Sequence, residues 1–85
     1  MDWRRSSHGE TNRSFFERME LALAQVRPRL KGDDPGLVML RAEHDVAAER
    51  LKVARRAGSE VSDEALRSVR LAVERLLQHV GRRAA

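Results

Sequence analysis

The chain has 85 residues, of which 41% are hydrophobic and 35% charged, and its formal net charge is +4. This length allows one small domain, which buries only about 60–65% of its unfolded surface. The absence of cysteine excludes a disulfide framework and a thiolate metal site. No apolar run is longer than that of Leu37–Leu40, which is much shorter than the roughly 20 residues of a membrane span. No apolar run follows the first arginines, as it would in a signal peptide, so we expect a cytoplasmic protein.

Residues 1–12 are polar and rich in serine, glycine and asparagine. We expect them to form a flexible tail, in which Trp3 is the one aromatic side chain. Residues 13–81 are expected to form a single helical domain, and residues 82–85 a basic C-terminal tail.

The first predicted helix begins near Ser14. Ser14 and Glu17 have the spacing of a capping box, in which each side chain accepts a hydrogen bond from a backbone N–H at the helix start. Pro28 removes a hydrogen bond and restricts the residue before it, so the helix should end or kink there. The apolar residues follow steps of three and four, which place them on one helical face: Phe16, Met19, Leu23, Val26 and Leu30.

A second helix is predicted from Pro35 to Ala57, with Asp34 as its N-cap and Gly58 as its stop. Arg41 and Asp45, four residues apart, are expected to form an ion pair on its surface. A flanking stripe contains Met39, Val46 and Val53. The main apolar face repeats the same rhythm: Leu37, Leu40, His44, Ala47, Leu51 and Ala54.

The third predicted helix starts at Ser62-Asp63-Glu64 and ends at about Val80, before Gly81. Its apolar face contains Leu66, Val69, Val73, Leu76 and Val80. Short links between helices make antiparallel neighbours. The sequence therefore predicts an all-α fold, either an antiparallel three-helix bundle or a helical hairpin completed by oligomerisation. Because Ala47 and Ala54 bury little area, the core is thin, which favours a partner.

No local motif indicates catalysis, since the chain has no glycine-rich phosphate loop, no cysteine and no serine–histidine–carboxylate arrangement. His44 lies on an apolar face and is interpreted as a boundary histidine rather than a ligand. Two histidines, His44 and His79, make a weak metal site without a carboxylate. We expect no enzyme, no cofactor and no metal.

The favoured function is a small non-catalytic adaptor or chaperone-like protein that acts by helix–helix contact with a protein partner or with its own copies. Leu21, Leu71 and Leu77 lie outside the main apolar faces and mark a partner-binding surface if they are exposed. The other candidates must also form core. The full candidate set is Phe15, Phe16, Met19, Leu21, Leu23, Leu66, Val69, Leu71, Val73 and Leu77.

The alternative is a basic nucleic-acid-associated regulatory protein. In an up-down-up bundle, four arginines gather at one end: Arg27, Arg29, Arg82 and Arg83. Such a cluster binds phosphates without sequence preference. Asp33 and Asp34 share that end and reduce its positive charge, so this function is ranked second.

Overall fold

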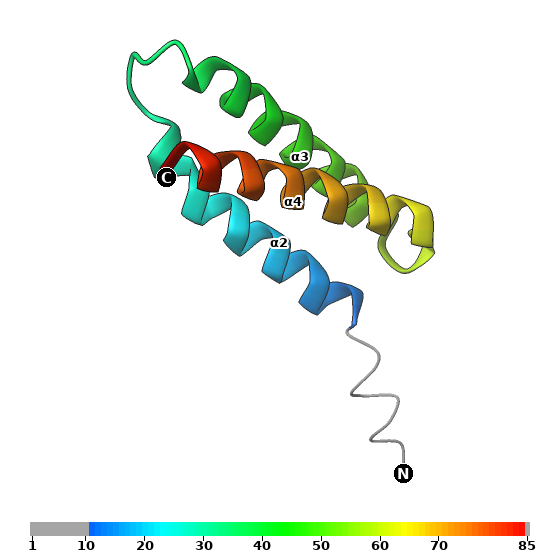
Figure 1. The fold of residues 1–85 in the computed structure, drawn as a ribbon. Helices are drawn as coiled ribbons and strands as arrows, with labels where there is room; N and C mark the ends of the chain where they lie inside the picture. The colour runs from blue at the N-terminus through cyan, green and yellow to red at the C-terminus, as the bar shows by residue number, and fades with distance from the viewer. Residues whose placement is uncertain (1–10, 85) are drawn as a thin grey trace.

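The structure is a computed structural model that describes residues 11–84. In this part of the chain three helices run up, down and up, joined by short connections, as Figure 1 shows. The predicted tail of residues 1–12, with Trp3, lies almost wholly outside the described residues. The elements are α2 (Asn12–Val26), the 3₁₀ turn η1 (Arg27–Leu30), α3 (Leu37–Ala57), the 3₁₀ turn η2 (Gly58–Glu60) and α4 (Asp63–Ala84).

Helix α2 begins at Asn12, and its N-cap is Thr11 rather than the predicted Ser14. The Thr11 hydroxyl accepts a hydrogen bond from the backbone N–H of Ser14 at 3.1 Å, and the Thr11 carbonyl accepts one from Phe15 at 3.0 Å. Both Thr and Ser cap helices well. The cap at Thr11 adds most of a further turn, so the capping box predicted for Ser14 was wrong.

The predicted effect of Pro28 is confirmed, since α2 ends at Val26 and the chain continues as the turn η1. Breaking a helix leaves carbonyl oxygens without partners. Arg41 of α3 acts as a partner for such carbonyls. Its guanidinium donates hydrogen bonds to the carbonyl oxygen of Leu30 at 2.7 Å and to that of Gly32 at 3.3 Å. Arg41 thus fastens the loop between α2 and α3, a role that the expected pair with Asp45 did not include.

Helix α3 begins at Leu37, slightly later than predicted. The Asp34 carboxylate accepts a hydrogen bond from the N–H of Gly36 at 2.8 Å, and so closes a turn that leads into the helix. The predicted end is confirmed at Ala57, where Gly58 takes a positive φ of 60°. A positive φ is strained for residues with a Cβ, and glycine accommodates it.

The predicted start of α4 is confirmed, because the helix begins at Asp63 and the Ser62 hydroxyl accepts a hydrogen bond from the N–H of Ala65 at 3.0 Å. The predicted end was wrong. Helix α4 continues through Gly81 to Ala84. Glycine inside a helix costs only about 1 kcal/mol, which neighbouring contacts can offset. Here the last turn carries Arg83, which forms an ion pair with Asp34.

The core lies along the axis of the bundle and takes residues from all three helices, with its most extensive contact between α3 and α4. Its most completely buried positions include Ala47 on α3 and Leu76 on α4, both at 0% exposure. Each predicted apolar face points inward, and aliphatic side chains dominate. The buried set is Phe15, Phe16, Leu23, Val26, Leu30, Leu37, Leu40, Ala47, Leu51, Ala54, Val69, Val73, Leu76 and Val80.

Polar contacts join the helices along the edges of this core. Glu20 of α2 forms an ion pair with Arg55 of α3. On the other side of α3, Glu43 accepts hydrogen bonds from Nδ1 of His79 in α4, with both carboxylate oxygens at 2.8 Å. These contacts connect α3 to each of its neighbours.

Two glycines should respond oppositely to alanine. Gly81 lies in α4 with no atom within 4 Å of an added Cβ, so Gly81→Ala should raise the free energy of unfolding by up to about 1 kcal/mol. Gly58 has the positive φ described above, so Gly58→Ala should lower it by more than about 1 kcal/mol. Urea denaturation followed by circular dichroism measures both. Equal effects at the two positions would contradict the conformations described.

Candidate protein-binding groove

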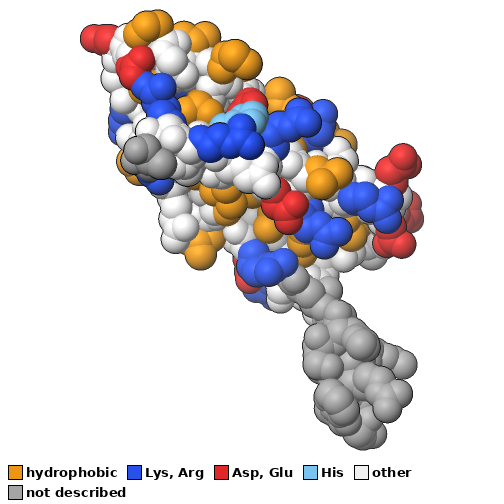
Figure 2. All heavy atoms as spheres, viewed as in Figure 1, with side chains coloured by type: hydrophobic (Ala, Val, Ile, Leu, Met, Phe, Trp, Pro, Cys, Tyr) orange, Lys and Arg blue, Asp and Glu red, His pale blue; other side chains and the backbone are white. Residues whose placement is uncertain are grey.

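An open groove of about 580 Å³ runs between α3 and α4. Its apolar lining includes Met39 and Val46 from α3 and Leu71 from α4, which are 72%, 47% and 56% exposed. Figure 2 shows hydrophobic side chains exposed among charged ones on the face that carries α4. Large apolar side chains grouped at a groove mark a candidate interaction surface.

The position of the groove follows from the spacing of residues on α3. Met39, Val46 and Val53 are seven residues apart, which places them on one stripe of the helix. This stripe lies beside the buried face that contains Ala47, and all three of its side chains are exposed. Helix α3 is therefore apolar over a wider arc than a three-helix bundle covers.

Charged side chains border the apolar part of the groove. Glu43 and Arg50 contribute from α3, and Glu74 and Arg75 from α4. The border therefore has two acidic and two basic groups. The contact of Glu43 with His79 fixes the Glu43 side chain against α4. The formal charges of the groove lining therefore sum to zero.

The structure separates the sequence candidates into core and surface. Leu21, Leu71 and Leu77 are exposed, and of these three only Leu71 lines the groove. Met19 and Leu66 are partly buried against the core. The remaining candidates are buried between the helices: Phe15, Phe16, Leu23, Val69 and Val73.

Sequence reasoning omitted Met39 and Val46 from the candidate site, although it placed them on a flanking stripe. Their seven-residue spacing was the available signal. The sequence did not indicate on which side of α3 the helix α4 packs. That side decides whether a flanking stripe is covered. Leu71 lies far from both in sequence, and only the packing of α3 and α4 brings the three residues to one groove.

Both histidines in the part of the chain that the structure describes have structural partners. Nε2 of the half-buried His44 lies 3.2 Å from the carbonyl oxygen of Leu23, which links α3 to α2. His79 contacts Glu43 as described. Within residues 11–84 no group of three or more His, Asp or Glu side chains is arranged to hold a metal ion.

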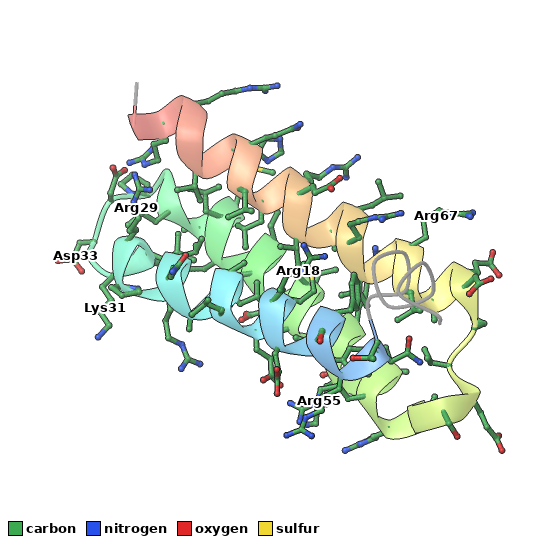
Figure 3. The ribbon with its side chains drawn as sticks, turned by 90° about the horizontal axis from the view of Figure 1, so that it is seen from below. Arg18, Arg29, Lys31, Asp33, Arg55 and Arg67 are labelled. Atoms are coloured by element: carbon green, nitrogen blue, oxygen red, sulfur yellow. The ribbon has the colours of Figure 1, made fainter. Side chains whose placement is uncertain are left out.

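The arginines proposed for nucleic-acid binding lie in η1 and in the last turn of α4, which are at the same end of the bundle (Figure 1). Figure 3 shows Arg29 and Lys31 at this end together with Asp33. Arg83 is occupied by its ion pair with Asp34. The end is therefore of mixed charge, and phosphate binding there stays a prediction.

Comparisons with protein-family models, curated proteins and solved structures find no match to this chain. Within the described residues, none of the helices has both the length and the apolar character needed to cross a bilayer. The groove itself is therefore the main structural observation on which a functional argument can rest.

If the groove is a binding surface, its apolar residues should contribute little to folding. We expect Met39→Gln and Leu71→Gln to change the free energy of unfolding by no more than about 0.5 kcal/mol, as at other surface sites. Leu51→Ala, in the core, should lower it by about 2–5 kcal/mol. Denaturation at a concentration where the chain is monomeric tests this. A large loss for Leu71→Gln would identify Leu71 as part of the folding core.

Proposed function

We propose that the protein is a small adaptor that binds an amphipathic helix in the groove between α3 and α4. The observation that carries the proposal is the exposure of Met39, Val46 and Leu71 in one groove. Burying such side chains contributes roughly 25 cal/mol per Å² of apolar area removed from water. A partner that covers the groove gains this free energy without rearranging the core.

The shape of the groove supports a helical partner. Two antiparallel helices present parallel ridges, and a third helix packs into the depression between them. The charged border offers groups of both signs beside an apolar centre. This arrangement fits an amphipathic helix with apolar residues on one face and charged residues along its edges.

The proposed role is non-catalytic. The groove is lined by Met, Ala, Val and Leu together with Glu, Arg and Gln. Within this lining no nucleophile is paired with a general base, the arrangement that covalent catalysis requires. We therefore propose binding, with specificity set by the charged border, as the activity of this site.

Site-specific photo-crosslinking tests the proposal. A photoreactive amino acid at Leu71, in the groove, should give a crosslinked protein adduct in the cells that produce the chain. Leu21 on α2 is a matched control, because it is the same residue type with a similar exposure of 59% but lies outside the groove. Adducts from position 71 and none from position 21 would support the proposal. No adduct from position 71, or equal adducts from both, would refute it.

A further inference from the structure

We propose that the helix bound in this groove is α3 of a second copy of the chain, packed antiparallel about a two-fold axis at Val46. This inference rests on the proposed function and names its partner. Two α3 helices would then lie side by side, each placing its exposed stripe against the groove of the other. Two-fold dimers with self-complementary surfaces are the commonest oligomers of soluble proteins.

The exposed stripe on α3 is symmetric about Val46. Met39 precedes Val46 by seven residues, and Val53 follows it by seven. At 1.5 Å per residue, both lie about 10.5 Å from Val46 along the helix, in opposite directions. A two-fold axis at Val46 therefore places each Met39 beside Val53 of the partner subunit. All three positions then contact apolar side chains.

Charged residues of α3 lie beside the exposed stripe, on its groove side, and their pattern is also self-complementary. Glu43 lies about 4.5 Å before Val46 along the helix, and Arg50 lies about 6 Å after it. In an antiparallel pair, this flank of one helix faces the same flank of the other. Each Glu43 is then level, to within about 1.5 Å, with Arg50 of the partner subunit. The two-fold axis therefore creates two such pairs, each with a negative charge facing a positive one.

The balance of charge favours a second copy over a strongly charged partner. The border contains two acidic residues, Glu43 and Glu74, and two basic residues, Arg50 and Arg75. A strongly acidic or strongly basic helix would therefore be repelled by part of it. A surface whose charges pair with those of an identical copy contains charges of both signs. The groove meets this requirement, although the whole chain has a formal charge of +4.

Disulfide trapping tests this geometry directly, because the chain contains no cysteine. Under mild oxidation Val46→Cys should form a covalent dimer on its own, since two copies of residue 46 meet at the axis. Met39→Cys alone should not, because the two copies lie about 21 Å apart along the helix. Mixed with Val53→Cys, it should form a heterodimer. Val53→Cys alone should stay monomeric, and Leu21→Cys on α2 is the control.

The pattern of crosslinks discriminates between arrangements. Covalent homodimers of Met39→Cys alone, with no Met39→Cys–Val53→Cys heterodimer in the mixture of the two variants, would indicate parallel helices and overturn the proposal. Crosslinking at Leu21→Cys equal to that at Val46→Cys would show random collision and would also overturn it. Circular dichroism of each variant confirms that the helices are retained.

Light scattering after size-exclusion chromatography gives the independent measurement. The unmodified chain should have the mass of a dimer, and Val46→Glu should weaken the dimer by at least about tenfold, because two carboxylates would meet at the axis. Leu21→Glu should leave the dimer unchanged. A monomer at every concentration would overturn the inference. If photo-crosslinking at Leu71 then captured a different protein, the proposed function would stand with another partner.

Discussion

The close contact between α3 and α4 is the constraint on which the rest of the fold depends. It is made possible by two small residues, Ala47 and Ala54, which are almost completely buried. Small side chains let helix axes approach closely, and Val69 and Val73 of α4 are buried in the same core as these alanines. Helix α4 leaves the next stripe of α3, with Met39, Val46 and Val53, exposed. The groove is a consequence of the way in which the core is built.

The three helices could be predicted because each has an unbroken apolar rhythm and clear breaking residues. Pro28, Gly58 and Ser62 act locally, through a missing N–H, a positive φ and a side-chain cap. The errors arose where two local signals competed or a distant residue decided the outcome. Thr11 and Ser14 are both capping residues. Helix α4 continues past Gly81, where Arg83 contacts Asp34 from another part of the chain.

The candidate site was less predictable than the fold. Burial separates core residues such as Leu23 from surface residues such as Leu71, yet both are leucines on helices with the same rhythm. The role of Arg41 was also hidden, since its partners are carbonyl groups of a loop that precedes α3. A pattern within one helix indicates which side chains share a face. It does not indicate which neighbouring helix, if any, lies over that face.

The polar contacts on the two sides of α3 bear on the handedness of the bundle. Three antiparallel helices can be arranged as two topologies of opposite handedness. Glu43 and Arg55 are twelve residues apart, about 120° around the helix, and contact α4 and α2 respectively. In the opposite topology α2 and α4 exchange sides, and neither residue meets its partner. These polar contacts at the two edges of α3 thus favour the observed handedness of this small bundle.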